Sequence, residues 1–366
     1  MFPGALRSLR LWTFFSTCAS YFKVILCNWK ANSLLSRRTM NEEQKTKNEE
    51  LDLSVIIVSW NTRELLRECL ESLFKFAPEA AFETFVVDNA SSDQSVAMVQ
   101  ENFPDVKVIA NSSNAGFSRA NNQAIHRSKG RYIALLNPDT VLIEDVFTPL
   151  LRYADANKET GAIGPKVLCR DGKTIQNVCA RRLPNLYFDF CRLSGLSRMY
   201  SGTRLFGGEY LSHWDHNDQR NVESLTGACM VVRKKTIGQV GMLDENQFMY
   251  GDEIDWCKRM LDAGWGIRYY PEAAIIHYGG ESSKQAKLAS SIESEKAQMY
   301  FYQKHKGRFY AFLFSVQVLF FNLGKYIWSM AFREKDAKGK ELMNIYKGLY
   351  LWSLKQIVSR DGRALS

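Results

Sequence analysis

The chain lacks the cysteine spacings that mark zinc and redox sites. It has 366 residues and eight cysteines, and no two of the cysteines form a Cys-x-x-Cys pair. A structural zinc site or a thioredoxin-like redox motif needs such a pair. We therefore expect reduced thiols that lie mostly in the core of a cytosolic protein.

Long uninterrupted apolar runs are also missing near the N-terminus. Residues 11–29 are apolar but contain Lys23, which makes them a weak signal peptide and a poor spanning helix. Met40 opens a polar stretch typical of a linker. Residues 1–50 are therefore either an anchor with a linker or, in part, an extension upstream of a start at Met40.

The apolar run near the C-terminus is short as well. In residues 309–332, Lys325 cuts the uninterrupted run below the roughly 20 residues that a spanning helix needs. Basic residues flank both sides, so the positive-inside rule gives no orientation. The pattern favours a helix lying on an anionic membrane surface, and a core helix is the alternative. We predict that residues 307–366 associate with the inner face of the cell membrane.

No nucleic-acid recognition module accompanies the net charge of +9. The basic residues gather mostly in residues 127–131, in residues 231–235 and beside the C-terminal apolar run. A positive charge of this size favours an anionic partner. We expect a membrane surface or a phosphorylated substrate rather than nucleic acid.

From residue 53 onward, short β-branched runs alternate with helical periodicity, which indicates an α/β fold with a mainly parallel sheet. The expected strands are 55–59, 85–88, 106–110 and 132–136, and the expected helices include one with Leu66, Cys69, Leu70, Leu73 and Ala77 on its apolar face and one over 117–127. Parallel strands end at one edge, where ligands bind. Polar residues stand at four such ends: Ser59, Trp60 and Asn61; Asp88 and Asn89; Asn111 and Asn114; Asn137 and Asp139.

Two of these strand ends carry a carboxylate. Asp139, in LLNPDT (135–140), could hold Mg²⁺ or Mn²⁺ together with phosphate oxygens. Asp88, in FVVDNASSD (85–93), could accept a hydrogen bond from a ribose or from the imino group of a pyrimidine. Turn and cap roles are the alternative for both segments.

Two downstream segments add titratable side chains. A helix should start near residue 252, with Asp252 as its cap and Asp255 three residues later, which leaves Glu253 as a general-base candidate. His277 should follow a strand over 267–270, in a flexible loop that closes over phosphates, as a phosphate or metal contact.

Seven segments together resemble glycosyltransferase family 2, in its rhamnosyltransferase-like branch. They are VIIVSWN (55–61), VVDNASSD (86–93), NAGFSRANN (114–122), LLNPDT (135–140), LTGACMVVRK (225–234), FMYGDEIDWCKR (248–259) and HYGGESS (277–283). The resemblance spans roughly residues 53–306. It implies a GT-A fold, with a nucleotide-binding half over 51–140 and an acceptor-binding half over 141–306.

The resemblance also implies roles for individual residues. The nucleotide-binding set would be Ser59, Trp60, Asn61, Asp88, Asn89, Ser91, Asn114, Gly116, Phe117, Asn122 and Asn137. Asp139 and His277 would bind a divalent cation, although Asn137 replaces the first acid of the DxD motif of relatives. Glu253 matches the catalytic base, and Asp252 is a second candidate because many relatives read Glu-Asp here.

The implied reaction is the inverting transfer of a sugar from a nucleotide-diphosphate donor, with dTDP-rhamnose as the expected donor. The acceptor would be a lipid-linked molecule or a polysaccharide in cell-surface glycan synthesis. A catalytically inactive sugar-nucleotide-binding protein is one alternative. A sugar-phosphate nucleotidyltransferase is another, but it needs a glycine-rich basic loop after the first strand, where this chain offers only Arg63. No readable pattern marks residues 170–221, where substrate selectivity is expected, and the oligomeric state is unknown.

Overall fold

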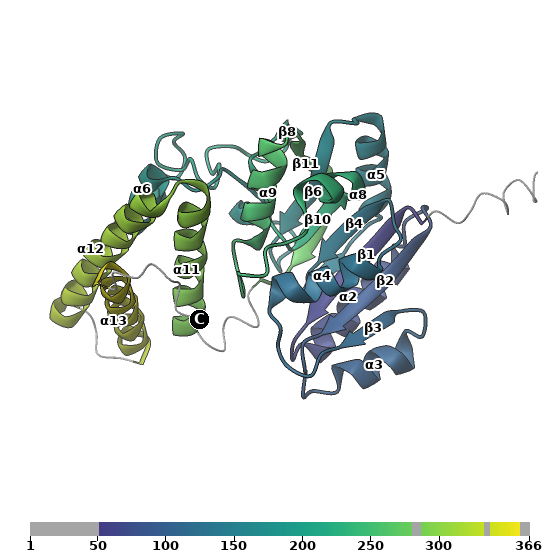
Figure 1. The fold of residues 1–366 in the computed structure, drawn as a ribbon, viewed down its shortest axis with the longest axis horizontal. Coiled ribbons are helices and arrows are strands. Elements are labelled where there is room, and N and C mark those ends of the chain that lie inside the picture. The colour runs from purple at the N-terminus through teal and green to yellow at the C-terminus, as the bar shows by residue number, and fades with distance from the viewer. Residues whose placement is uncertain (1–50, 280–286, 333–336, 359–366) are drawn as a thin grey trace, which may run out of the picture. The chain divides into compact units, whose positions relative to one another are not determined.

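The computed structural model describes residues 51–279, 287–332 and 337–358 (Figure 1). The expectations for residues 1–50 and for Gly280 onward in HYGGESS lie outside the described residues. The elements of the first part are β1 (Leu53–Ser59), α2 (Arg63–Lys75), β2 (Phe82–Asp88), α3 (Ser95–Asn102), β3 (Lys107–Ala110), α4 (Phe117–Arg127), β4 (Tyr132–Leu136), β5 (Thr140–Leu142), α5 (Phe147–Ala156) and β6 (Thr160–Leu168).

The later elements are shorter at first and then mostly helical. They are η1 (Asn177–Cys179), β7 (Ala180–Arg181), α6 (Leu186–Ser194), α7 (Leu196–Met199), β8 (Arg220–Asn221), β9 (Ser224–Leu225), β10 (Cys229–Arg233), α8 (Lys234–Val240), α9 (Asp252–Asp262), β11 (Gly266–His277), α11 (Lys287–His305), α12 (Arg308–Phe332) and α13 (Ala337–Val358).

The central sheet has nine strands in the order β3-β2-β1-β4-β10-β6-β11-β5, with β8 paired to β11. Strands β3, β2, β1, β4, β6 and β11 run in one direction, whereas β10, β5 and β8 run in the other. The prediction of an α/β fold with a mainly parallel sheet is confirmed. The sequence pattern did not reveal that β10, from the LTGACMVVRK segment, inserts antiparallel between β4 and β6.

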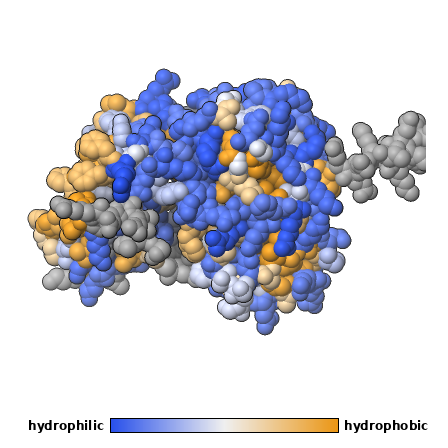
Figure 2. All heavy atoms as spheres, viewed as in Figure 1, coloured by the Kyte–Doolittle hydropathy of each residue, from blue (hydrophilic) through white to orange (hydrophobic). Residues whose placement is uncertain are grey.

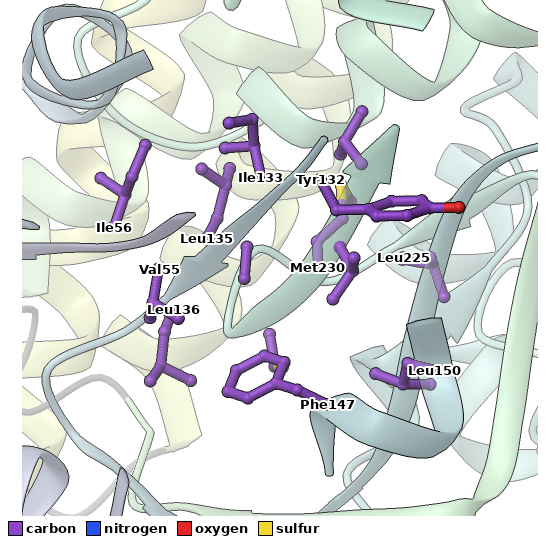
Figure 3. Packing of buried hydrophobic residues seen from close by; sticks show 14 of the residues in the cluster. Val55, Ile56, Tyr132, Ile133, Leu135, Leu136, Phe147, Leu150, Leu225 and Met230 are labelled. Atoms are coloured by element: carbon purple, nitrogen blue, oxygen red, sulfur yellow. The ribbon is translucent and has the colours of Figure 1, made fainter. Parts of the chain in front are cut away.

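The core lies against the middle strands of this sheet. Ile56, Ile133 and Leu135 are completely buried, and Phe147 of α5 packs against the same cluster (Figure 3). Five of the six cysteines in the described residues are buried, all six are free thiols, and only Cys169 is partly exposed. Burial raises the pKa of Cys69 to about 12. These thiols are core residues, as expected.

Several predicted boundaries are wrong, and two of the errors have a clear physical cause. Helix α2 ends at Lys75, before Ala77, because the residue that precedes Pro78 is disfavoured in the α conformation. The strand expected to stop at Tyr270 continues as β11 to His277. A register shift between Tyr270 and Ala274 lets the strand pass through Pro271, since proline is tolerated at a bulge. His277 therefore ends a strand rather than lying in a flexible loop.

The C-terminal helices α11, α12 and α13 pack on one another, and α12 also packs on α6. Tyr302, Phe314 and Val318 form a second buried cluster there. An ion pair also joins α6 to α11, because Arg192 of α6, which also binds Asp189 on its own helix, donates to Glu295 Oε1 of α11 (3.0 Å). These helices thus form a packed extension of the domain.

Helix α12 presents an apolar stripe to solvent. Phe309, Val316, Phe320, Leu323 and Ile327 recur at helical spacing and all are exposed, Phe320 at 71%. Figure 2 shows hydrophobic residues gathered where this helix lies. The helix includes Lys325, so it is longer than the uninterrupted run, and at 25 residues it is long and apolar enough to cross a membrane. Length and composition do not establish a span, since core helices of soluble proteins meet the same criterion.

Candidate active site

The ends of β1 and β2 place a buried carboxylate at the sheet edge. Asp88 pairs in register with Ser59 and is only 2% exposed. Its Oδ2 accepts a hydrogen bond from the Ser91 N–H (2.9 Å), whereas its Oδ1 is buried without a partner among the described residues. An unpaired buried carboxylate oxygen is costly. Asp88 Oδ1 therefore marks a position where a ligand donor would be stabilised.

The loops that follow β1 and β2 hold one another beside Asp88. The Asn61 N–H donates to Ser91 Oγ (2.9 Å), and Asn61 Oδ1 accepts from the Ser92 N–H (2.8 Å). Asn61 has φ of 52°, in the left-handed region that asparagine tolerates better than most residues. Trp60, next to it, keeps its side chain 40% exposed. The loops that follow β1 and β2 thus form one side of the candidate site at the sheet edge.

Asn89 and Asn114 shape the loop before α4. Asn89 Oδ1 accepts from Asn111 Nδ2 (2.9 Å), and Asn89 Nδ2 donates to Gly116 O (3.2 Å). Asn114 Oδ1 accepts from the Gly116 N–H (3.0 Å). These amides order the loop. Asn122 lies farther along α4, where its Nδ2 donates to Leu243 O (2.9 Å), so it fixes a different segment.

Gly116 is needed where this loop meets the segment that leads to α9. Its φ of 82° is strained for other residues, and an added Cβ would lie 2.7 Å from Phe248 O. The Phe117 N–H donates to the same carbonyl (3.0 Å). The NAGF segment and the FMYGDE segment are therefore in direct contact.

Asp139 and His277 meet because β5 pairs antiparallel with the end of β11. His277 stands opposite Thr140, and the Tyr278 N–H donates to Asp139 O (2.9 Å). His277 Nε2 lies 3.1 Å from Asp139 Oδ1 and 3.3 Å from Asn137 Nδ2. The structure thus brings together Asn137, Asp139 and His277, as the sequence predicted.

Glu253 lies in the first turn of α9 and forms an ion pair. Arg181 Nη2 donates to Glu253 Oε1 (2.6 Å), and the two side chains are 16% and 14% exposed. Arg181 belongs to β7, which pairs with β9. Glu253 therefore does not point into bulk solvent.

The predicted cap at Asp252 is wrong. The N-cap of α9 is Gly251, with φ of 73°, and Asp252 is the first helical residue. Asp252 is 1% exposed and accepts a hydrogen bond from Ser118 Oγ (2.5 Å). Burial raises the pKa of Asp252 well above its ordinary value, and the neighbouring Glu253 raises it further. The Asp252 side chain is therefore buried in the core and does not cap the helix.

Asp255 is not a capping partner either. It accepts from His305 Nε2 (2.7 Å) and pairs with Lys304 Nζ (2.8 Å), both on α11, and with Arg259. Although burial opposes it, hydrogen bonds from His305 and Lys304 hold the pKa of Asp255 below its usual range. Asp255 therefore fastens α9 to α11.

Asp139 and His277 fit a cation site whose remaining ligands come from a bound nucleotide. Within the described ranges, no group of three acidic, histidine or cysteine side chains converges on one point. Asp139 and His277 give two ligands, and a bound diphosphate could supply further oxygens, as is common for Mg²⁺. An all-protein metal cage is not needed for such a site.

The sequence analysis missed two residues within 170–221, the region without a recognisable pattern. Gln176 contacts the His277 ring and Arg181 contacts Glu253, and these two residues are five positions apart in the chain. The Cα atoms of Gln176 and Arg181 are therefore at most about 18 Å apart, since an extended chain spans up to ~3.6 Å per residue. One short segment thus contacts both His277, the candidate cation ligand, and Glu253, the candidate base. No periodicity could have revealed these contacts, because they arise from tertiary pairing.

Comparison with known proteins decides the family. Residues 54–212 match the model of glycosyl transferase family 2. The chain carries a family 2 glycosyltransferase domain. An N-acetylglucosaminyl-diphospho-decaprenol L-rhamnosyltransferase of Mycobacterium tuberculosis is 26% identical over 70% of this chain and 85% of its own length. Rhamnosyltransferase WbbL of Escherichia coli is 24% identical over 63% of this chain and 84% of its own length.

A solved structure supports the fold of this glycosyltransferase. A mannosyltransferase from Pyrobaculum calidifontis, in complex with GDP-Man and Mn²⁺, superposes with a TM-score of 0.51 at 13% identity. The match covers 91% of this chain and 96% of that one. The predicted family, its rhamnosyltransferase-like relatives and the GT-A type of fold are confirmed.

Proposed function

We propose that this glycosyltransferase moves rhamnose, with inversion, from dTDP-rhamnose to a hydroxyl group of a lipid-linked or polysaccharide acceptor. The observation that carries the proposal is the juxtaposition of Asp139 Oδ1 and His277 Nε2, 3.1 Å apart, at the edge where Asp88 leaves a buried oxygen unpaired. Strands β2 and β4 flank β1, Asp88 ends β2, and Asp139 follows the end of β4 by three residues. The rhamnosyltransferase relatives support the choice of sugar.

The chain's own residues suit the two ends of a nucleotide sugar. Asp88 Oδ1 would accept the imino hydrogen of the pyrimidine or a ribose hydroxyl group. Asp139 and His277 would hold Mg²⁺ or Mn²⁺, which supplies positive charge to the departing diphosphate. The pyrimidine and the diphosphate would then occupy neighbouring parts of one edge.

Glu253 would act as the general base. It would take the proton of the acceptor hydroxyl as the oxygen attacks the anomeric carbon from the face opposite the leaving group. Arg181 holds Oε1 at 2.6 Å and so fixes the direction of the carboxylate. No hydrogen bond to Oε2 occurs among the described residues, which leaves this oxygen for the acceptor.

A thermal-shift screen of nucleoside diphosphates tests the donor site. We expect thymidine and uridine diphosphates with Mn²⁺ to raise Tm more than cytidine or adenosine diphosphate, because Asp88 Oδ1 needs a donor such as an imino N–H, which cytosine and adenine lack. A ligand present at 100 times its Kd stabilises the folded state by about 2.7 kcal/mol.

The matched control for this screen is Asp93→Asn, in the same loop. Both carboxylate oxygens of Asp93 accept hydrogen bonds within the protein, from the Arg63 N–H, the Ser95 N–H and Ser95 Oγ. Asp88→Asn should lose the pyrimidine-dependent shift, whereas Asp93→Asn should keep it. Equal shifts with all nucleotides in the wild type would argue against a pyrimidine donor.

We also propose that the α12 stripe rests on an anionic membrane. Lys306 and Arg308 precede the exposed apolar residues, which suits a surface of anionic headgroups. The site would then work on acceptors that are held at the inner face of the membrane.

Substituting the stripe tests this membrane proposal. Phe309→Gln/Phe320→Gln/Ile327→Gln should lower binding to vesicles that contain anionic lipid by at least ~10-fold, since each buried apolar side chain contributes about 1.5–3 kcal/mol. A truncation after Gly307 is a poorer test because it also removes buried Phe314 and Val318. Sedimentation with vesicles gives the bound fraction.

The control for vesicle binding is Met199→Gln/Leu205→Gln. These residues are 71% and 59% exposed but lie outside the C-terminal helices. Binding should be unchanged in this variant. Undiminished binding of the triple α12 variant would remove α12 from the membrane contact.

A further inference from the structure

Gln176 makes two hydrogen bonds to the same histidine. Its Nε2 donates to the backbone carbonyl of His277 (2.6 Å), and its Oε1 lies 3.0 Å from His277 Nδ1. Because the NH₂ group of the amide is used on the carbonyl, the atom that faces Nδ1 is an acceptor. The imidazole must therefore carry a hydrogen on Nδ1.

The backbone places Gln176 there without help from a ligand. Strand β6 runs parallel to β11, with Leu168 opposite Ile276, so β6 ends beside His277. The chain then reverses through a tight turn at Gly172, and Ile175 forms a bridge back to Leu168. The Gln176 N–H donates to Val167 O (2.9 Å), which fixes its position next to β11.

The two hydrogen bonds also set the direction of the imidazole. With Nδ1 held by Gln176, Nε2 faces Asp139 Oδ1 at 3.1 Å and Asn137 Nδ2 at 3.3 Å. A histidine that binds a metal usually donates its other ring N–H to an oxygen acceptor, which fixes the ring and increases the basicity of the ligating nitrogen. Gln176 Oε1 is such an acceptor.

We propose that Gln176 is the positioning residue for His277. It orients the ring so that Nε2, and not Nδ1, points at Asp139. This inference rests on the proposed function only for its use in cation binding, because the orientation itself is a property of the protein. Gln176 acts through His277 and touches no substrate in this scheme.

The first test observes the ring hydrogen directly, without metal or substrate. In protein with ¹⁵N-labelled histidine, the Nδ1–H of His277 should give a slowly exchanging resonance, assigned by its loss in His277→Ala. Gln176→Leu should abolish it, because the hydrogen then exchanges with water. Gln176→Glu keeps an acceptor for Nδ1–H and should retain it. Gln219→Leu, which alters a partly exposed glutamine bonded to Glu272, should have no effect.

The second test measures the affinity for Mn²⁺ alone, by the electron paramagnetic resonance signal of the free ion. Gln176→Leu should weaken binding about 10–100-fold, the range typical of an outer partner of a metal-binding histidine. Gln176→Leu should add no further loss in the His277→Ala background if it acts only through that ring. Gln219→Leu should bind like the wild type.

The outcomes separate this inference from the proposed function. A His277 Nδ1–H resonance that is absent from the wild type, or that persists in Gln176→Leu, would overturn the role of Gln176. Losses of Mn²⁺ affinity that add in the double variant would do the same. A wild-type protein that binds no Mn²⁺ would remove the cation from the proposed function, while the ring resonance still decides whether Gln176 positions His277.

Discussion

Replacing Asp139 with asparagine is expected to lower metal-stimulated turnover by at least about 100-fold. Asp139 is the acidic residue that faces His277, and asparagine would replace its charged oxygen with a neutral group at the same position. A cation that neutralises a leaving diphosphate contributes several kcal/mol, and each ~1.4 kcal/mol of barrier corresponds to tenfold in rate. Initial rates measured across a Mn²⁺ titration would show the loss.

The control for this substitution is Asp262→Asn. Asp262 ends α9, and its side chain is 58% exposed. This variant should respond to Mn²⁺ like the wild type. Unchanged wild-type turnover in EDTA would show that the reaction needs no exchangeable cation, and the metal role of Asp139 would then be wrong.

Replacing Glu253 with glutamine should lower turnover by about 10²- to 10⁴-fold, the usual contribution of a general base. Glutamine has the same shape and can still accept the hydrogen bond from Arg181 through its Oε1. Binding of the donor should therefore be nearly unchanged. Steady-state kinetics would show the effect in kcat, and calorimetry with the nucleoside diphosphate would show that the donor site is intact.

Asp252→Asn separates the two neighbouring acids. Asp252 is 1% exposed and bonded to Ser118, so the acceptor cannot reach it in this conformation. Asparagine can still accept from Ser118, and we expect a much smaller loss of turnover than for Glu253→Gln. If Glu253→Gln retained the wild-type rate while Asp252→Asn lost it, the base would be Asp252.

The sheet and its polar edge could be predicted because local patterns determine them. The apolar runs that end at Asp88 and at Leu136 are buried strands, and α4 covers the predicted residues 117–127. The family resemblance implied a shared cation role for Asp139 and His277, and the two side chains lie 3.1 Å apart. The antiparallel pairing of β5 with β11, which brings them together, cannot be predicted from the sequence, because β5 has only three residues and Pro271 interrupts the pattern of the other strand.

The partners of the candidate side chains could not be predicted. Gln176 and Arg181 lie in a region without periodicity, and their roles depend on a hairpin and on two-residue strands. Asp252 matched the residue types of a helix cap, but a glycine in the left-handed conformation took that position and turned the carboxylate inward. Contacts between residues far apart in the sequence determine both the positions of Gln176 and Arg181 and the burial of Asp252.

The ion pairs of Asp255 connect the helix of the candidate base to the C-terminal helices. Helix α9 carries Glu253, and Asp255 on the same helix binds Lys304 and His305 at the end of α11, directly before α12 begins. With α12 resting on lipid as proposed, Glu253 would lie at a fixed distance from the bilayer surface. The enzyme would then modify only hydroxyl groups that the acceptor presents at that distance from the membrane.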